Sequence, residues 1–490
     1  MAEKLQKLIN DYPAMRWTAL VLVALMMFFG YMFVDVMSPL QQLVEAERGW
    51  SPDAFGTYAS AEYLLNVFGF LILAGIILDK MGIRFTGTLS ASMMFVGAAI
   101  KFYAVSDWFA GSGLEAWLNS WWVSMPGSAK LASLGFMIFG CGCEMAGITV
   151  SKSIAKWFKG KEMALAMGVE MAIARLGVFA VLSISPLIAN KYGGSVEKPV
   201  LFCTILLIIG LINFIVFSLM DRKLDKQLAA NAMGSAEDSS DEEFHISDLK
   251  AIFTSKMFWI IALLCVLYYS AIFPFQRYAT NFLECTLHIP AADAANLFRW
   301  FPILAMVLTP FLGSFIDYKG KGASMLMYGA LIMIICHLSF AFLLPAFPSK
   351  GLALLLIVVL GVSFSLVPAS LWPSVPKVIE PKILGSAYSL IFWIQNIGLC
   401  FVPKIIGNVL AATNPGIEQA RSAATSAIAN GELDAAVMHT DPSLMYNYTT
   451  CMVIFASFGI IAFIMGIWLK IEDKKKGYGL ELPNVVKDNK

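Results

Sequence analysis

Two apolar runs joined by a basic turn decide the fold: Phe136-Met-Ile-Phe-Gly-Cys-Gly-Cys-Glu144-Met-Ala-Gly147 and Glu170-Met-Ala-Ile-Ala-Arg175-Leu-Gly177. Each run holds a charge among apolar residues, Glu144 in the first and Arg175 in the second. If both runs cross a bilayer, these charges lie near its middle, where a charged side chain costs at least ~2.5–3.5 kcal/mol. An ionisable residue at that depth indicates a functional site. The turn carries Lys152, Lys156, Lys159 and Lys161.

The composition is typical of a membrane protein. Apolar residues make up 58% of the 490 residues and charged residues 14%, against ~25% charged in soluble domains. Repeated apolar runs of roughly 20 residues exclude a soluble enzyme, and the net charge of +1 gives no reason to expect nucleic acid. No nucleophile–base pair or metal-ligand set converges at one depth, so we expect neither an enzyme nor a cofactor or metal.

The apolar runs predict an all-α membrane protein with twelve transmembrane helices in two six-helix halves. The stretch Glu237-Asp-Ser-Ser-Asp-Glu-Glu243 is too acidic to cross a membrane and indicates a flexible linker. We expect an N-terminal half over 1–220, a cytoplasmic linker over 221–255, a C-terminal half over 256–475 and a cytoplasmic tail over 476–490. The predicted spans are 17–38, 56–78, 86–106, 131–151, 164–189, 199–220, 257–280, 297–316, 324–345, 351–375, 384–410 and 446–469.

The distribution of basic residues predicts the orientation. With residue 1 inside, the inner segments hold 24 of the 35 Lys and Arg, the outer loops hold 6, and 5 lie within spans. Because cytoplasmic loops are enriched in Lys and Arg, both termini are expected in the cytoplasm. The amino-terminal segment shows no obvious sorting sequence, so we expect a bacterial plasma (inner) membrane, with a lysosomal membrane as the alternative.

A short pattern recurs in the two halves at an offset of 238 residues. Glycine, aspartate and glycine stand at identical spacing after the second helix of each half, followed by basic residues, which indicates a tandem duplication. The first copy comprises Gly75, Asp79, Lys80, Gly82 and Arg84, and the second comprises Gly313, Asp317, Gly320 and Lys321.

This repeated pattern and the twelve-span layout resemble the major facilitator superfamily. The resemblance implies alternating access, and it implies that the aspartate-containing loop latches one half to the other in the outward-open state. The first copy would form the stronger latch, since Tyr318 stands where a basic residue is usual in the second. A plain hairpin anchor is the alternative role.

A narrower resemblance is carried by Gly140-x-Gly142-x-Glu144, by Trp157-Phe-Lys-Gly-Lys-Glu162 and by Ala174-Arg175-Leu-Gly177. These segments resemble the lysosomal dipeptide transporter branch of the superfamily and its bacterial relatives. The resemblance implies that Glu144 holds the ammonium end of a peptide and Arg175 its carboxylate. Many proton-coupled members carry an arginine at the position of Phe136, so uniport or weak coupling is favoured over strict proton symport.

The rise per residue of a helix places the two charges at a similar depth. Glu144 lies eight residues before Lys152, or about 12 Å, and Arg175 lies 12 residues after Met163, or about 18 Å. Both therefore fall near the middle of a ~30 Å core. They could bind the two ends of a zwitterion or form a plain ion pair. Glu170, one turn below Arg175, could pair with Arg175 or Lys152 or contact substrate.

The remaining charges within spans lie elsewhere by the same measure. Most reach the outer edge of their spans, where we expect solvated rims or an outer gate, with Glu62 and Arg299 as gate candidates. Lys101 lies above the midplane and is expected to extend outward, while His337 is expected to pack in the core. The outer-edge set is Asp35, Glu62, Arg277, Arg299 and Lys404. Aromatic and amide candidates for the cavity are Tyr31, Tyr268, Tyr269, Trp372, Gln395 and Asn396.

We therefore predict a secondary transporter that moves small peptides, above all dipeptides, by alternating access. Two alternatives remain open at this point. One is a proton-coupled facilitator of another organic anion, metabolite or drug, and the other is a membrane receptor or assembly subunit without transport. The predicted partners are a zwitterionic substrate, the lipid bilayer and, as a further candidate, an accessory membrane protein.

Overall fold

The computed structural model describes residues 7–122, 124–158, 163–232, 252–379 and 384–483. The described residues form helices joined by turns, with no β-strand among them. Twelve segments are long and apolar enough to cross a membrane, which confirms the predicted all-α membrane fold.

The first half contains α1 to α8, of which the short α2 and α5 lie between the spanning helices. The helices are α1 (Pro13–Asp35), α2 (Gln41–Arg48), α3 (Pro52–Leu65), α4 (Leu71–Val105), α5 (Gly113–Asn119), α6 (Gly127–Trp157), α7 (Met163–Lys191) and α8 (Glu197–Ala232).

The second half repeats this order and adds two helices, α17 and α18, before its last span. Its helices are α10 (Lys256–Leu287), α11 (Ala291–Phe298), α12 (Trp300–Lys319), α13 (Gly322–Leu338), α14 (Leu344–Ala346), α15 (Lys350–Val378), α16 (Leu384–Thr413), α17 (Ile417–Ala429), α18 (Val437–Thr440) and α19 (Thr449–Lys476).

Two boundaries differ from the sequence expectation. Helix α8 continues to Ala232, so residues 221–232 of the predicted linker are helical, and the acidic stretch 237–243 lies outside the described residues. Helix α4 covers both the end of the second span and the whole third span, and Gly82 breaks it with φ +77° and ψ 172°. A residue that carries a Cβ rarely adopts such a φ, so the glycine of the motif makes the turn between the two spans.

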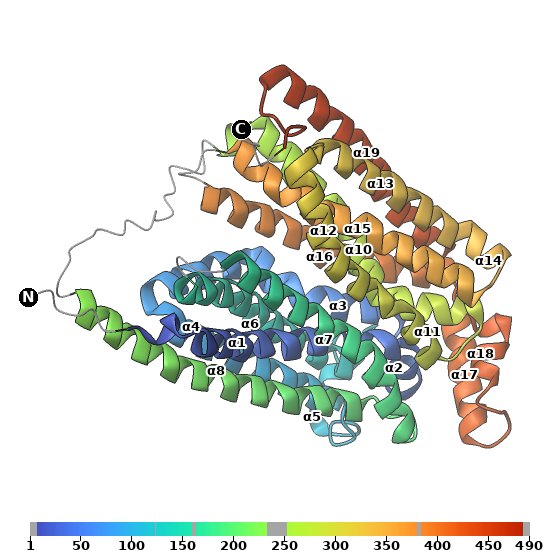
Figure 1. Ribbon diagram of the computed structural model, residues 1–490. Helices are drawn as coiled ribbons and strands as arrows, with labels where there is room; N and C mark the ends of the chain where they lie inside the picture. Colours follow the sequence, from blue (N-terminus) through green and yellow to red (C-terminus); the bar gives the residue numbers. More distant parts are fainter. Residues whose placement is uncertain (1–6, 123, 159–162, 233–251, 380–383, 484–490) are drawn as a thin grey trace, which may run out of the picture.

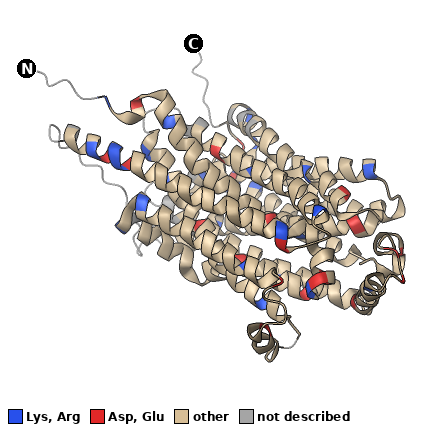
Figure 2. Ribbon diagram, turned by 90° about the horizontal axis from the view of Figure 1, so that it is seen from below, with Lys and Arg blue, Asp and Glu red and all other residues tan. Residues whose placement is uncertain are grey.

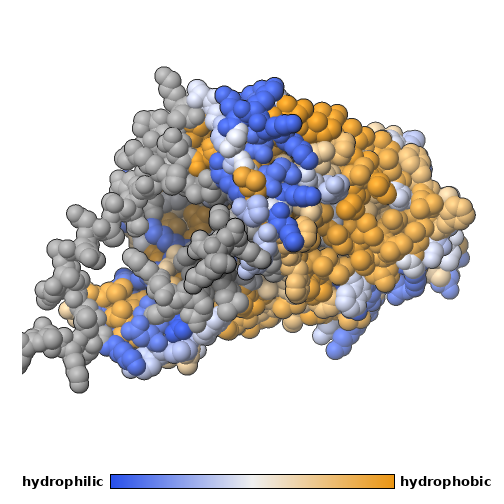
Figure 3. Space-filling view, turned by 45° about the horizontal axis from the view of Figure 1, so that its top comes forward, coloured by the Kyte–Doolittle hydropathy of each residue, from blue (hydrophilic) through white to orange (hydrophobic). Residues whose placement is uncertain are grey.

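The two halves meet at one end of the molecule and diverge toward the other (Figure 1). The open end is the one where α1 begins and α19 ends, and the closed end holds α2, α5, α11, α17 and α18. Charged residues gather toward the two ends of the helices and the middle of the bundle is mostly uncharged (Figure 2). A hollow between the halves is visible at the open end (Figure 3).

Helices α3 and α16 form the tightest contact between the halves at the closed end. A Cβ on Gly407 would stand 2.4 Å from the Pro52 carbonyl oxygen, and a Cβ on Gly56 would stand 2.7 Å from the Pro403 carbonyl oxygen. The backbones therefore touch, and a larger residue at either glycine would separate them.

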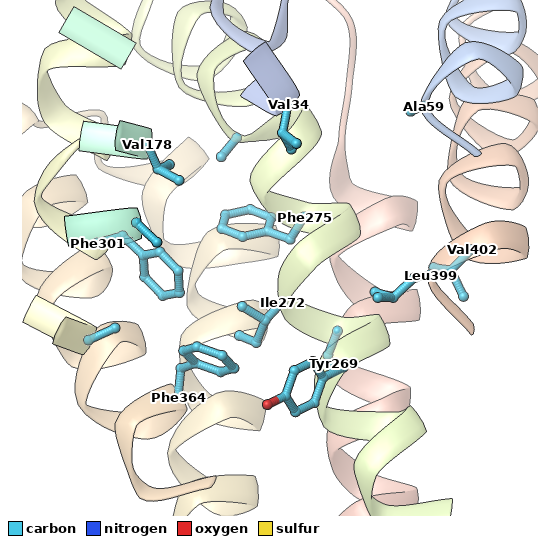
Figure 4. Close-up of a cluster of buried hydrophobic side chains, with 14 of the residues drawn as sticks. Val34, Ala59, Val178, Tyr269, Ile272, Phe275, Phe301, Phe364, Leu399 and Val402 are labelled. Atoms are coloured by element: carbon cyan, nitrogen blue, oxygen red, sulfur yellow. The ribbon is translucent and has the colours of Figure 1, made fainter. Parts of the chain in front are cut away.

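An apolar cluster joins the halves beside this contact (Figure 4). Val34 and Val178 of the first half lie near Phe275 and Phe301 of the second half, and all four are buried. Burial of apolar area gives ~25 cal/mol per Å², so the cluster stabilises the closed arrangement of this end.

Candidate functional site

A set of ion pairs closes the end where the halves meet, and we call it the closure layer. In it, every carboxylate belongs to the first half and every cation belongs to the second half. Such complementarity fixes the register of two surfaces. The pairs are Arg277 Nη1 to Asp35 Oδ1 at 2.9 Å, Arg277 to Glu62, Lys404 to Asp53, and Arg421 Nε to Glu45 Oε2 at 2.9 Å.

Arg277 on α10 is the centre of the layer. Its Nη1 donates to the Val34 carbonyl oxygen at 2.5 Å as well as to Asp35, and its Nη2 donates to Glu62. The neighbouring Gln276 donates to the other Asp35 oxygen at 2.6 Å. One guanidinium thus binds two carboxylates on α1 and α3, an arrangement that suits its planar, multiply donating geometry.

The expectation of solvated rims is wrong for this set. Asp35 is 1% exposed, Glu62 4% and Arg277 7%. Rise per residue gives the height of a side chain but not whether the other half covers it. The gate candidates do not contact each other either, because Glu62 binds Arg277 while Arg299 Nη1 donates to Ser183 Oγ on α7 at 3.1 Å.

Lys101 on α4 also departs from expectation, because it does not extend outward. Its side chain is 0% exposed, and its ammonium lies 4.2 Å from the centroid of the Phe33 ring, 5.0 Å from Tyr58 and 4.4 Å from Phe136. Among the described residues it has no hydrogen-bond acceptor. His337 is buried as expected, packed on Phe275 and neighbouring rings.

The charges singled out by the sequence lie on the open-end side of the closure layer. Glu144 is one turn beyond Gly140, whose backbone packs on Glu62, and Gly177, beside Arg175, packs on Phe28, two turns before Asp35 on α1. Glu144 on α6, and Arg175 and Glu170 on α7, are each partly exposed. All three lie within electrostatic range of the Tyr31 hydroxyl on α1, so they converge on one region. Among the described residues, no ion pair joins Glu144 or Glu170 to Arg175. The plain ion-pair alternative for Glu144 and Arg175 is therefore absent from this conformation.

Aromatic side chains surround Arg175 and come from both halves. Its guanidinium carbon lies 5.6 Å from the Tyr31 ring centroid in the first half and 5.4 Å from the Phe273 ring centroid in the second. Trp372 Nε1 donates to the Tyr269 hydroxyl at 3.3 Å, and Tyr269 lies within electrostatic range of Arg175. Cation–π contacts of this kind orient a guanidinium without neutralising it, so its charge stays available to an anion.

Three of the other cavity candidates are used for packing. Tyr268 is buried and donates to the Leu326 carbonyl oxygen within the second half. Gln395 is buried and accepts from the Cys265 thiol at 3.3 Å. Asn396 is 2% exposed, and its Nδ2 finds no partner among the described residues. Helical spacing alone could not separate these inner faces from the cavity face.

The first copy of the repeated motif is tied to its own half in this conformation. Arg84 Nη1 binds Asp225 Oδ2 at 2.5 Å and Asp221 Oδ2 at 3.4 Å, both on α8. Lys156 on α6 binds Asp221 Oδ1 at 2.7 Å and Asp225 Oδ1 at 2.5 Å. Within the described part of the chain, these residues make no polar contact with the other half.

The second copy is bound by the segment that follows α19. Gly320 has φ +72°, and the amide of Lys321 donates to the Glu481 carbonyl oxygen at 2.9 Å. The Glu481 carboxylate accepts from the Ser324 amide at 2.7 Å and from its hydroxyl at 2.9 Å. Glu481 therefore caps the first turn of α13. The motif turn is thus bound by aspartates of α8 in the first half, and by Glu481, which follows α19, in the second half.

The remaining motif residues lie at the open end. A Cβ on Gly75 or on Gly313 would meet nothing within 4 Å. Lys80 is exposed, whereas the side chains of Asp79 and Asp317 lie outside the described set. Close packing against these glycines is therefore not a property of this conformation, and the predicted latch between halves stays a prediction.

Comparison with known proteins identifies relatives over most of the chain. Residues 20–403 match the family model of the Major Facilitator Superfamily. The lysosomal dipeptide transporter MFSD1 of Danio rerio is 27% identical over 408 residues, covering 81% of this chain and 80% of that protein. The Homo sapiens protein of the same name is 25% identical over 410 residues, with 81% and 80% covered.

Solved structures confirm the fold. A bacterial homologue of the human lysosomal transporter Spinster, in an inward-facing and occupied conformation, superposes with a TM-score of 0.66 at 15% identity, covering 94% of this chain and 98% of that one. The nucleoside transporter NupG gives 0.63 at 14% identity, covering 92% and 99%. At these identities the likeness concerns the fold alone.

Proposed function

Because the chain belongs to the major facilitator superfamily, a family of transporters, we propose that it carries small zwitterionic peptides, above all dipeptides, by alternating access. The observation that supports this proposal is the environment of the Arg175 guanidinium group. Its guanidinium lies between aromatic rings of the two halves, partly exposed and with no carboxylate at ion-pair distance among the described residues.

Glu144 supplies the opposite charge that a zwitterion needs. It is partly exposed, and it shares with Arg175 the surroundings of the Tyr31 hydroxyl while remaining unpaired with it. A dipeptide spans about 7 Å at ~3.3–3.6 Å per residue. A carboxylate and a guanidinium held apart in one wet chamber would therefore bind the ammonium and carboxylate ends of such a molecule.

The proposed location of the site agrees with alternating access. Glu144 and Arg175 lie on the open-end side of the closure layer, and the two halves diverge toward that end (Figure 1). Transporter sites of this kind lie near the midplane, where two halves that rock against each other meet. Arg175 contacts Phe273 of the second half, so the motion that parts the halves also alters the surroundings of the proposed anchor.

The direction of opening follows from the orientation that the basic residues favour. Helix α1 begins and α19 ends at the open end (Figure 1). With both termini cytoplasmic, the structure represents an inward-facing state. We place the protein in a bacterial plasma membrane, and the MFSD1 relatives, named as lysosomal, keep the lysosomal membrane as the alternative.

We propose uniport or weak coupling as the mode of transport. The position of Phe136, where many proton-coupled members carry arginine, is 0% exposed, and its ring stacks on Tyr58 with centroids 4.8 Å apart. The side chain of Phe136 itself carries no titratable group that could relay a proton.

Two pairs of protein and ligand changes test the site in proteoliposomes. N-acetylation of a dipeptide removes the charge that Glu144 binds, and C-terminal amidation removes the charge that Arg175 binds. In wild type, both changes should reduce competition with a labelled dipeptide by ~10-fold or more per lost charge-assisted contact. In Glu144→Gln the acetylation effect should vanish and the amidation effect should persist, with the reverse pattern in Arg175→Ala.

Lys350→Ala serves as the control, since Lys350 pairs with Asp293 in an exposed position away from the chamber. Unchanged dipeptide flux in both Glu144→Gln and Arg175→Ala would discard the site. A thermal-shift screen with cationic, neutral and acidic dipeptides in which none stabilises the protein would favour another organic substrate. A partner protein retained through purification, together with absent flux, would favour the receptor alternative.

A further inference from the structure

Lys101 is a buried cation that the transport site does not use. It is held by three aromatic rings from three helices, Phe33 on α1, Tyr58 on α3 and Phe136 on α6. It is 0% exposed and its ammonium lacks a hydrogen-bond acceptor among the described residues. Aromatic rings attract a cation but satisfy none of its three N–H donors, so Lys101 remains poised for a better partner.

Three of the four titratable or charged groups that face Lys101 belong to the closure layer. Within electrostatic range are Asp35 on α1, Glu62 on α3, Cys203 on α8 and Arg277 on α10. Both cations contact the Phe136 ring, whose centroid is 4.4 Å from the Lys101 ammonium and 5.6 Å from the Arg277 guanidinium carbon. Two cations and two carboxylates thus share one dry region at the boundary between the halves.

These four charges belong to different halves, and this decides what happens when the closed end opens. Asp35, Glu62 and Lys101 travel with the first half, whereas Arg277 travels with the second. Alternating access moves the halves largely as rigid bodies. Opening the closed end therefore removes Arg277 from the two carboxylates, and two like charges are left side by side.

We propose that Lys101 is a charge-exchange residue, which replaces Arg277 as the partner of Asp35 and Glu62 when the halves part at the closed end. In the conformation described here, Lys101 contacts the three aromatic rings and pairs with neither carboxylate. This inference rests on alternating access and is independent of the substrate, so its test measures conformation as well as flux.

The local arrangement allows this exchange. Tyr58 lies one turn before Glu62 on α3, and Phe33 lies two residues before Asp35 on α1. The rings and the carboxylates are therefore carried by the same two helices and stay together when the halves move. A lysine side chain has a flexible four-carbon stem, so a change of rotamer carries the ammonium from the rings toward a carboxylate that Arg277 has left.

The test is a distance measurement across the closed end. Spin labels on Tyr192→Cys, after α7, and Phe347→Cys, after α14, occupy exposed sites on the two halves. Cys143→Ser removes the partly exposed native thiol, since the other seven cysteines are buried. A long distance between the two labels marks molecules whose closed end has opened, and we call these molecules the long-distance population. In Lys101→Met this population should be lost at about pH 7.5. It should return at about pH 5, where the freed carboxylates take up protons.

Three further variants separate charge exchange from packing. Lys101→Arg should keep the long-distance population at both pH values. Lys101→Met/Glu62→Gln should regain it at neutral pH, because one carboxylate no longer needs a cation. His337→Leu is the matched control, since His337 is also 0% exposed and without a hydrogen-bond partner among the described residues, yet it lies away from the layer.

Transport should follow the same pattern, with flux in Lys101→Met reduced ~10-fold or more at neutral pH and recovering in acid. A wild-type distance distribution in Lys101→Met at neutral pH would overturn the proposal. So would a loss that is equal at both pH values and is not rescued by Glu62→Gln. If dipeptides fail as substrates while the distances respond as expected, only the assigned substrate is wrong.

Discussion

Arg277 on α10 binds Glu62 on α3 across the boundary between the two halves, and both side chains are less than a tenth exposed. The same guanidinium binds Asp35 on α1 at 2.9 Å. This one residue therefore connects the first, second and seventh spanning helices, and the closed end depends on it.

Arg277→Ala should weaken the closed end strongly. It leaves two buried carboxylates without their partner, and removing one member of a buried pair costs ~3–5 kcal/mol. We expect a lower midpoint of thermal unfolding in detergent. We also expect more molecules in which the closed end has opened, measured with spin labels on Tyr192→Cys and Phe347→Cys. Arg277→Ala/Asp35→Asn/Glu62→Gln should recover much of the loss. Lys350→Ala, which breaks an exposed pair with Asp293, should change stability by at most ~1 kcal/mol.

Gly407→Ala should open the contact between α3 and α16. The added Cβ would lie 2.4 Å from the Pro52 carbonyl oxygen, closer than any tolerated contact. Overpacking of this kind costs ~1–3 kcal/mol, so the long-distance population across the closed end should rise. Gly113→Ala is the matched control, because a Cβ there meets nothing within 4 Å and Gly113 lies outside the repeated motif. An identical distance distribution in Gly407→Ala and wild type would contradict the contact.

Arg175→Lys tests geometry separately from charge. Lysine keeps the positive charge but loses the planar fork and its stacking between the Tyr31 and Phe273 rings. We expect the KM for a dipeptide to rise ~10-fold, equivalent to ~1.4 kcal/mol, with a smaller change in maximal flux. Equal KM values for the two proteins would show that the guanidinium does not hold the substrate.

Glu481→Ala should destabilise the second half. The variant removes the two hydrogen bonds from Ser324 that cap α13, and loss of such a cap costs ~0.5–2 kcal/mol. The thermal midpoint should fall without a change in the relative uptake of different dipeptides. Glu432→Ala is the control, since Glu432 is exposed in the loop after α17. A selective loss of uptake with unchanged stability would assign the tail a role in gating instead.

Much of the architecture follows from the sequence, because the length and hydropathy of an apolar run identify it as a membrane-spanning helix. Each of the twelve predicted spans overlaps one spanning segment of the structure, although the first, sixth, seventh and twelfth segments end 7–10 residues later than predicted. The duplicated motif correctly indicates the turn at Gly82 and its counterpart at Gly320. Glu144 and Arg175 were placed in the same region by counting residues, and both face the surroundings of Tyr31. Their role in binding stays a prediction.

What could not be predicted depends on contacts between segments far apart in the chain. Counting residues placed Lys101 above the midplane, but only packing shows that three rings enclose it. Asp35 and Arg277 lie 242 positions apart, so no local pattern reveals that they pair. Glu481, which caps α13, likewise lies 157 positions from Ser324.

The sorting of acids and bases between the halves has a consequence for how such a protein can be built. A pair of identical first halves would set the carboxylates of the closure layer against their own copies, and two second halves would do the same with their cations. Two identical halves therefore cannot form this arrangement, in which acids and bases are sorted between the halves. If the two halves are expressed as separate polypeptides, each first half should pair with one second half, and neither half should pair with a copy of itself.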